Sequence, residues 1–483
     1  MSKSKSITNN FVWSSILAIA GYVFPLITFP YVTRVLNPDG FGYTQFADSV
    51  VQYFSILALL GINSIGIREI ARVRNNRVKM SIVYNSLLTL NLIATIAVIF
   101  ILLTLSFVFP SFASHQDLLF IGSARILCGT LVVEWFYKGI EEFRYITIRA
   151  LLVRSIYVIL VFIFVRQEDD YIIYFILTTL IAVVNAIINI CYSTKYVNYS
   201  LSHLNLRPYI IPFVTLGAFQ VLTAVYTYLN TIYLGVVSDD TQVGYFSIAT
   251  KIHHIILSLY TAFTSVMLPR MSALSLEYDK DKFFDMINRS CAVLFVFSFP
   301  LMILLYIFAP EIIGLLAGQA YGSSIPCLRI IIPLIFVIGY EQILVIQILV
   351  PLRKDSAILI NSSIGAMVCV FSNLLFVKSL LSQGTSMVWL LSEVSVMLSA
   401  QFFVKRFTAF SFPFKLFIES FIVAVPAFLF VYCLSLINFD KYVNFVLAST
   451  LIVIYYYFVY KYILKNSIIN ELICSFINKI HHV

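Results

Sequence analysis

The sequence predicts an all-α integral membrane protein with about fourteen transmembrane helices, arranged as two six-helix lobes plus two C-terminal helices. Three observations predict this fold. Of the 483 residues, 60% are hydrophobic and only 11% are charged, whereas a soluble domain carries about 25% charged residues. Apolar segments long enough to cross a bilayer follow one another along the chain. A short motif near the start also recurs, loosened, near the middle.

The predicted spans are stretches of about 17 or more mostly apolar residues, the length that a helix needs to cross the hydrocarbon core. They are 11–33, 44–67, 80–109, 118–137, 146–165, 171–194, 208–237, 243–268, 286–309, 325–350, 356–377, 384–404, 412–437 and 442–460. The first span follows Lys3 and Lys5, as a signal peptide would, but its apolar run is too long. We therefore expect it to be retained.

Lys and Arg residues gather in alternate loops. With both ends in the cytoplasm, the inner segments hold 25 of the 32 Lys and Arg residues, and the outer loops hold only Arg34, Arg166, Lys378 and Lys441. Positive charge is enriched on the cytoplasmic side of membrane proteins. The bias predicts an even number of spans and two cytoplasmic termini.

The repeated motif is Phe41–Ala47, which recurs as Val243–Ala249 at an offset of 244 − 42 = 202 residues. Six predicted spans separate the copies, so both halves cross the membrane in the same sense, as in a parallel repeat. Such repeats are typical of transporters, in which two similar bundles alternate around a central site. The predicted parts are an N-terminal lobe at 1–200, a C-terminal lobe at 201–410, two helices at 411–463 and an amphipathic cytoplasmic tail at 464–483.

Composition and motifs exclude several other classes. The net charge of +9 is spread over short loops rather than gathered in a stripe, so we expect no nucleic-acid partner. The seven cysteines form no C-x-x-C pair, and no metal or other cofactor is predicted. No G-x-x-x-x-G-K-[ST] motif indicates ATP hydrolysis.

Two segments carry a family resemblance. Pro30–Gly42, reading PYVTRVLNPDGFG, and Gly61–Arg72, reading GINSIGIREIAR, resemble the end of span 1 and the exit of span 2 in Wzx-type polysaccharide flippases. These belong to the multidrug/oligosaccharidyl-lipid/polysaccharide (MOP) exporter superfamily. Asn37 departs from the family, which usually has Gly before this Pro.

The resemblance implies a V-shaped, MATE-like fold with spans 1, 2, 7 and 8 around a central cavity. It implies a bacterial inner-membrane flippase, not an enzyme, that moves oligosaccharide repeat units of O-antigen, capsule or cell-wall polysaccharide. These units are linked to undecaprenyl diphosphate and pass from the inner to the outer leaflet. Membrane lipids, and polysaccharide polymerase or other assembly proteins, are the further partners that it implies.

Polar residues line one face of three predicted spans. The stripes are Gln45, Asp48, Gln52 and Ser55 on span 2, Gln220, Thr223, Thr227 and Asn230 on span 7, and Lys251, His254, Ser258, Thr261 and Ser265 on span 8. Such residues either join helices by hydrogen bonds or line a wet cavity. We expect a cavity for the stripes that contain Asp48 and Lys251, because charge inside a span is costly.

Four cations lie in or near the outer halves of the spans: Arg34, Arg125, Lys251 and Arg329. A diphosphate carries negative charge across a low-dielectric region, and guanidinium and ammonium groups would bind it. We predict that these cations contact substrate. The alternative is that Arg34 reaches to the interface and Arg329 balances an acid such as Glu311.

The intramembrane acids are Asp48, Glu134, Glu341, Glu393 and Glu419. An acid in a cavity can bind H⁺ or Na⁺ and couple transport to an ion gradient, or it can neutralise a neighbouring cation. We expect Asp48 to pair with Lys251, and Glu341 to be a further polar or coupling residue of the cavity.

Two other functions compete with export of a lipid-linked glycan. A MATE-like drug or cation antiporter shares the repeat but usually has twelve spans. A membrane glycosyltransferase or polysaccharide polymerase would use an acidic loop, which Glu168–Asp170 resembles. Such enzymes have a sizeable outer loop, whereas every outer loop predicted here has about twenty residues or fewer.

Overall fold

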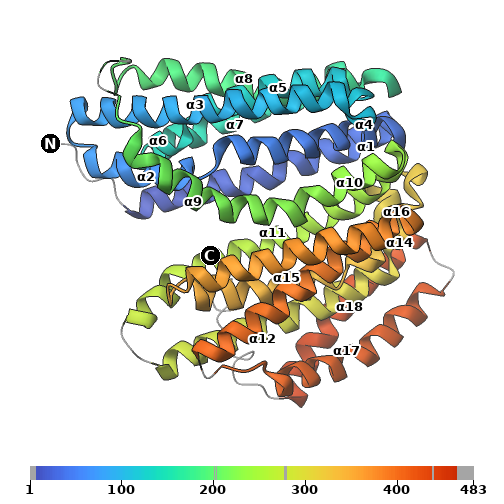
Figure 1. Ribbon diagram of the computed structural model, residues 1–483. Helices are drawn as coiled ribbons and strands as arrows, with labels where there is room; N and C mark the ends of the chain where they lie inside the picture. The colour runs from blue at the N-terminus through green and yellow to red at the C-terminus, as the bar shows by residue number, and fades with distance from the viewer. Residues whose placement is uncertain are drawn as a thin grey trace. The chain divides into compact units, whose positions relative to one another are not determined.

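The computed structural model describes residues 7–200, 202, 204–276, 280–408, 410–437 and 440–464, and all regular structure within these ranges is helical (Figure 1). The amphipathic helix predicted at 464–483 lies outside them, apart from Leu464. By their contacts, the residues form two compact units, Met1–Ser247 with Val377–Thr385, and Ile248–Phe376 with Ser386–Val483. The predicted lobe boundary at 200 and the parallel relation of the lobes stay predictions.

The first unit begins with α1 (Ile7–Leu59), which contains predicted span 11–33 and most of predicted span 44–67. Its 53 residues would be about 80 Å long as a straight helix, well beyond the hydrocarbon thickness. Asn37 interrupts it with φ 55° and ψ 173°, just before Pro38. A non-glycine residue at positive φ is unusual, and proline lacks the backbone donor that would continue the ladder. The kink therefore separates the two spans.

Helices α2 to α8 complete the predicted spans 2 to 6. They are α2 (Ile62–Val73), α3 (Arg77–Val108), α4 (Pro110–Ala113), α5 (Gln116–Leu131), α6 (Glu134–Gly139), α7 (Phe143–Phe164), η1 (Glu168–Asp170) and α8 (Tyr171–Ser193). A core of aromatic and branched side chains, including Tyr84, Trp135 and Phe136, packs at the end where α2, α3 and α6 meet.

The acidic stretch Glu168–Asp170 forms a short turn, η1, between α7 and α8. The Asp170 carboxylate accepts hydrogen bonds from the backbone N–H groups of Arg166 and Gln167, at 2.7 and 2.8 Å. Asp170 thus has a local structural use, because it satisfies donors that a helix start leaves open.

Predicted span 7 is a broken helix. It consists of α9 (Arg207–Ala224), the π-helix η2 (Val225–Leu229) and α10 (Asn230–Val237), with a bend of 42° between Ala218 and Gln220. Predicted span 8 is α11 (Asp240–Leu276), which starts in the first unit and continues into the second after Ser247.

The second unit contains the remaining predicted spans. Its elements are α12 (Lys280–Ile307), α13 (Ala309–Leu316), η3 (Gln319–Tyr321), α14 (Ser324–Ile331), α15 (Leu334–Gln342), the π-helix η4 (Ile343–Leu349), α16 (Asp355–Phe407), α17 (Phe414–Ser435), α18 (Lys441–Phe458) and η5 (Val459–Ile463). Helix α16 repeats the design of α1, since its 53 residues are interrupted at Leu381, with φ 50°.

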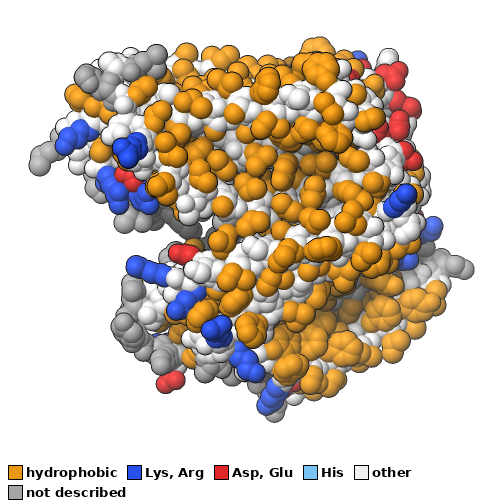
Figure 2. All heavy atoms as spheres, in the orientation of Figure 1, with side chains coloured by type: hydrophobic (Ala, Val, Ile, Leu, Met, Phe, Trp, Pro, Cys, Tyr) orange, Lys and Arg blue, Asp and Glu red, His pale blue; other side chains and the backbone are white. Residues whose placement is uncertain are grey.

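Ten helices of the described chain are long and apolar enough to cross a membrane, or eleven if the bent α9–α10 pair is one span. The two longest each cover two predicted spans, and α11 covers the predicted span 243–268. Hydrophobic side chains cover much of the visible face (Figure 2). This surface would be unfavourable in water and suits lipid, so the protein is a multi-span, all-helical membrane protein.

Exposed basic and acidic side chains lie at opposite ends of the first unit. Arg68, Arg72 and Arg74 are well exposed near the α2–α3 turn, and Glu168 and Asp169 are exposed in η1. Figure 2 shows basic side chains at one end of this unit and acidic ones at the other. The basic end is the one that is predicted to face the cytoplasm, as the positive-inside rule requires. The orientation itself stays a prediction.

Candidate substrate-binding and coupling sites

An intramembrane ion pair joins α1 to α5 in the first unit. Nη1 of Arg125 donates to Oδ1 of Asp48 at 2.6 Å. The Arg125 and Asp48 side chains are 20% and 33% exposed, so the pair is half-buried. Because the pair is only half-buried, another anion can compete with the Asp48 carboxylate for the Arg125 guanidinium.

Tyrosines from three elements surround this pair. Tyr157 on α7 and Tyr174 on α8 interact with one another and, electrostatically, with both Asp48 and Arg125. Tyr228, in the π-helix η2, interacts with the same two charges. Phenol groups combine a ring with a polar tip, so the site presents both stacking and hydrogen-bonding groups.

The other polar residues of spans 2 and 7 have mixed roles. Gln45 is buried, and Gln52 and Gln220 are half-buried. Nδ2 of Asn230 donates to the Tyr226 carbonyl one turn earlier, at 3.0 Å. That bond supports the backbone beside the π-helix, so Asn230, which is 1% exposed, is part of the helix structure here.

The four predicted cations fall in both units. Arg34 is exposed on α1, before the kink, and Arg125 is in the same unit. Lys251, on α11, and Arg329, on α14, belong to the second unit. A cavity common to all four cations would need residues of both units, as would the predicted Asp48–Lys251 pair, and both stay predictions. Within its own unit, Asp48 pairs with Arg125.

Arg329 contacts a tyrosine rather than an acid. Its Nε donates to the Tyr306 carbonyl at 3.1 Å, and its guanidinium carbon lies 5.2 Å from the centre of the Tyr306 ring. No ion pair between Arg329 and Glu311 is present among the described residues. Glu311 is therefore not the acid that pairs with Arg329 among the described residues, and the substrate role of Arg329 stays a prediction.

The second unit has its own cluster of polar and aromatic side chains. Nε1 of Trp389 donates to the Glu393 carboxylate at 3.1 Å. The rings of His253 and His254 lie 5.0 and 5.5 Å from the Trp389 ring. Glu341, from α15, interacts electrostatically with Glu393. This arrangement brings the predicted residues His254 and Glu341 into one neighbourhood.

Gly42 and Gly244, the glycines of the two motif copies, both lie in the first unit and pack reciprocally. A side chain at Gly42 would overlap the backbone carbonyl of Asp240, and one at Gly244 would overlap that of Pro38. Each glycine thus packs on the residue four positions before its counterpart. Such a reciprocal contact is what a local two-fold relation produces.

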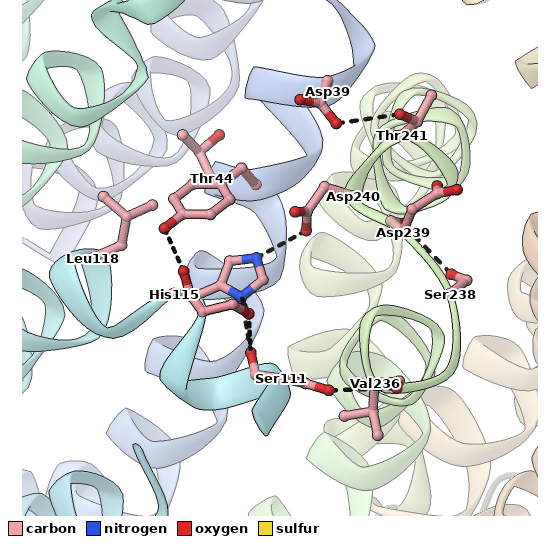
Figure 3. Close-up of polar contacts among 12 residues, drawn as sticks. Asp39, Thr44, Ser111, His115, Leu118, Val236, Ser238, Asp239, Asp240 and Thr241 are labelled. Carbon is pink, nitrogen blue, oxygen red and sulfur yellow. Dashed lines mark hydrogen bonds and ion pairs between the residues drawn. The ribbon is translucent and has the colours of Figure 1, made fainter. Parts of the chain in front are cut away.

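A hydrogen-bond network surrounds this contact (Figure 3). His115, just before α5, is 4% exposed, and its Nε2 lies 2.8 Å from Oδ1 of Asp240. Its Nδ1 lies 2.8 Å from the Ser111 carbonyl oxygen. The ring stacks on Tyr43 at 4.3 Å between centres. The network ties the start of α11 to α4, α5 and α1.

Sequence reasoning missed several of these residues. His115 and Asp240 lie in predicted outer loops, where polar residues normally meet water. Trp389 and His253 look like ordinary residues of apolar spans. The one available signal was that Asp240 is the repeat counterpart of Pro38. Among the described residues, no group of three or more His, Cys, Asp or Glu side chains is arranged to hold a metal ion.

Comparison with known proteins relates the sequence to polysaccharide export. The profile of a family described as "Polysaccharide biosynthesis protein" matches residues 7–275. A protein of Escherichia coli (strain K12) named "Putative O-antigen transporter" is 24% identical over 373 residues, which are 76% of this chain and 89% of the relative. A protein of Shigella dysenteriae with the same name is 25% identical over 72% of this chain and 87% of that protein.

Solved structures show the fold. One is the lipid II flippase MurJ in an inward closed conformation. The superposition covers 94% of this chain and 99% of the MurJ chain, with a TM-score of 0.74 and 14% identity. Another is an inward-facing multidrug resistance transporter of the MATE family, in the MOP superfamily. The superposition covers 82% of this chain and 97% of the transporter chain, with a TM-score of 0.65 and 15% identity. The chain has a MurJ- and MATE-like fold, and the MATE-like part of this result confirms what the family resemblance implied.

Proposed function

Because the chain belongs to the polysaccharide biosynthesis protein family, we propose that it is a flippase for undecaprenyl-diphosphate-linked oligosaccharide repeat units. It moves units of O-antigen, capsule or cell-wall polysaccharide from the inner to the outer leaflet of a bacterial inner membrane. Transport proceeds by alternating access, with both termini in the cytoplasm. A polysaccharide polymerase or other assembly protein then takes the delivered glycan.

The Arg125–Asp48 pair is the observation that carries the proposal. It places a guanidinium in the membrane beside Tyr157, Tyr174 and Tyr228. A guanidinium suits the oxygens of a diphosphate, and tyrosines suit the faces and hydroxyls of sugars. A lipid-linked oligosaccharide has both parts.

The same pair suggests how transport is coupled to an ion. When a diphosphate takes Arg125, Asp48 loses its partner. An unpaired carboxylate in the membrane is costly, so a bound H⁺ or Na⁺ would neutralise it. Glu341 and Glu393 offer a second place for such an ion in the second unit.

The second candidate function is export of organic cations. It is favoured by the cluster of Trp389, His254 and Glu393, because aromatic faces and a carboxylate attract a cationic ligand. On this alternative, Arg125 would repel the substrate rather than bind it.

The test replaces the proposed cations one at a time. Arg34→Ala, Arg125→Ala and Lys251→Ala should each reduce surface delivery of the lipid-linked glycan about tenfold or more, the usual effect of losing a bond to a charged group. Lys251→Arg should retain more activity than Lys251→Gln. The control is Arg166→Ala, which removes an exposed arginine outside the spans.

Normal glycan delivery by all three alanine variants, at normal abundance in the membrane, would refute the proposal. Increased resistance to cationic drugs in cells that produce the parent protein, lost in Glu393→Gln, would support the alternative.

A further inference from the structure

A second group of charges lies away from the Arg125–Asp48 pair, where α5 ends and α6 begins. Val133 adopts the left-handed conformation, with φ 41°, and breaks the helix. The next residue, Glu134, accepts from Nη2 of Arg149 at 2.8 Å and lies 3.4 Å from Nζ of Lys138. Arg154, five residues beyond Arg149 on α7, interacts electrostatically with Glu134 and Arg149. Three cations therefore share one carboxylate.

The guanidinium groups of this cluster have unused donors. The Arg149 side chain is only 4% exposed, and its Nε and Nη1 have no hydrogen-bond partner among the described residues. Nη1 of Arg154 is also buried without a partner there. Buried, incompletely paired charge is strongly unfavourable unless something compensates it. The arrangement is typical of a binding site for an anion with several oxygens.

The cluster is open on one side. The Glu134 and Lys138 side chains are 32% and 35% exposed, whereas the Arg149 side chain that contacts Glu134 is buried. The Glu134 carboxylate occupies the position between Arg149 and Lys138 that a phosphate group would take. A phosphate could displace it, and the half-exposed glutamate has room to move aside.

A small apolar groove runs along α7, beginning one turn after Arg149. It lies between α7 and α8 and is lined by residues that include Val153, Tyr157, Leu160, Leu177, Ile181 and Val184. Arg149 precedes Val153 by four residues, so one turn of the helix separates the guanidinium's position from the start of the groove. A ligand with an anionic head and an apolar chain fits this order.

We propose that the Glu134–Lys138–Arg149–Arg154 cluster and the α7–α8 groove form a binding site for a prenyl diphosphate, with its head on the cations and its chain in the groove. The geometry defines the site, and the identity of the lipid rests on the proposed function. The α6–α7 connection is predicted to be cytoplasmic, so the site would receive the lipid from the inner leaflet before the lipid reaches Arg125. Glu134 holds the cations together until the diphosphate replaces it.

The experiment uses the position of Trp135, which directly follows Glu134 and is 2% exposed. The chain has three tryptophans, so Trp13→Phe and Trp389→Phe leave Trp135 as the only fluorescent indole. The purified full chain in lipid nanodiscs is titrated with farnesyl diphosphate, farnesol or inorganic diphosphate. Arg149→Gln and Lys138→Gln should each weaken farnesyl diphosphate binding about tenfold or more, and Glu134→Gln should strengthen it. Arg144→Gln, an exposed arginine on the same helix, is the matched control.

Farnesyl diphosphate should bind more tightly than either farnesol or inorganic diphosphate. Equal affinity for farnesol would overturn the anion site, and equal affinity for inorganic diphosphate would overturn the groove. If Arg149→Gln does not fold, Lys138→Gln at the rim decides, and Arg149→Lys should retain part of the affinity. If Arg125→Ala lowers both binding and export while Arg149→Gln and Lys138→Gln lower neither, this site is refuted and the proposed function stands. If no correctly folded variant binds a prenyl diphosphate, both fail.

Discussion

Asp39 and Thr241 are 202 residues apart, which is the offset of the internal repeat, and the Thr241 hydroxyl donates to the Asp39 carboxylate at 3.3 Å. The two residues are thus counterparts that contact each other. Gly42 and Gly244, also counterparts, pack reciprocally on the carbonyls of Asp240 and Pro38. A pair of equivalent residues in mutual contact lies close to a local two-fold axis. The recurring motif is therefore a contact surface as well as a trace of duplication.

The first prediction concerns the two glycines. Gly42→Ala and Gly244→Ala should each destabilise the protein by about 1–3 kcal/mol, because the added methyl group overlaps backbone that cannot rotate away. The measurement is the unfolding temperature of the purified protein, together with its abundance in the membrane. Gly129→Ala is the matched control, since nothing lies within 4 Å of its added atom. Loss of stability in all three variants alike would contradict the packing explanation.

The second prediction concerns Asp48 and Arg125. Asp48→Asn and Arg125→Gln should each reduce stability, because each leaves a charged partner in the membrane without its counter-ion. The double variant should lose less than the sum, with a coupling of about 0.5–3 kcal/mol. Chemical unfolding of the four proteins measures this coupling. A coupling of zero would mean that the two charges do not interact in solution.

The third prediction concerns His115. His115→Ala removes both the Asp240 contact and the ring stack on Tyr43, and should destabilise the protein by about 1–3 kcal/mol. His115→Gln keeps a donor for Asp240 but loses the stack, so its loss should be intermediate. Thermal unfolding compares these variants with Asp169→Asn, which changes an exposed acid. Equal stability of His115→Ala and the parent would show that the network contributes nothing measurable.

The fourth prediction concerns orientation. Asn75 and Asp239 are both exposed and lie at opposite ends of the predicted topology. After the exposed Cys191 and Cys433 are replaced by Ser, an impermeant thiol reagent applied to intact cells should label Asp239→Cys but not Asn75→Cys. Permeabilised cells, in which both should react, provide the control. The reverse pattern in intact cells would invert the proposed membrane topology.

The sequence predicted the helices well, because a membrane span must satisfy its own backbone hydrogen bonds and so becomes an apolar run of known length. Each of the fourteen predicted stretches falls mostly on helical residues, with short breaks such as Leu60–Gly61 and Val132–Val133. The breaks were harder to foresee. Asn37 and Leu381 interrupt otherwise continuous helices through backbone conformation, and the π-helices η2 and η4 have no established sequence signature.

The charged sites were only partly predictable. Composition singled out Asp48 and Arg125 because ionisable residues are rare within spans, but no periodicity links two residues 77 positions apart. Sequence reasoning named Glu134 as one more intramembrane acid. It did not foresee the cluster around it, which lies where the left-handed Val133 separates α5 from α6, a break that no sequence pattern predicted.

The course of α16 has a practical consequence for protein engineering. This helix leaves the second unit at Phe376, contributes Val377–Thr385 to the first unit and returns at Ser386. In the first unit, the Ser382 hydroxyl donates to the Gln242 side chain at 2.7 Å. A chimera made with a relative by one cut near Ser247 would place this short insert in a foreign background. Exchange of the units as intact modules requires three cuts, so that residues 377–385 travel with the N-terminal half.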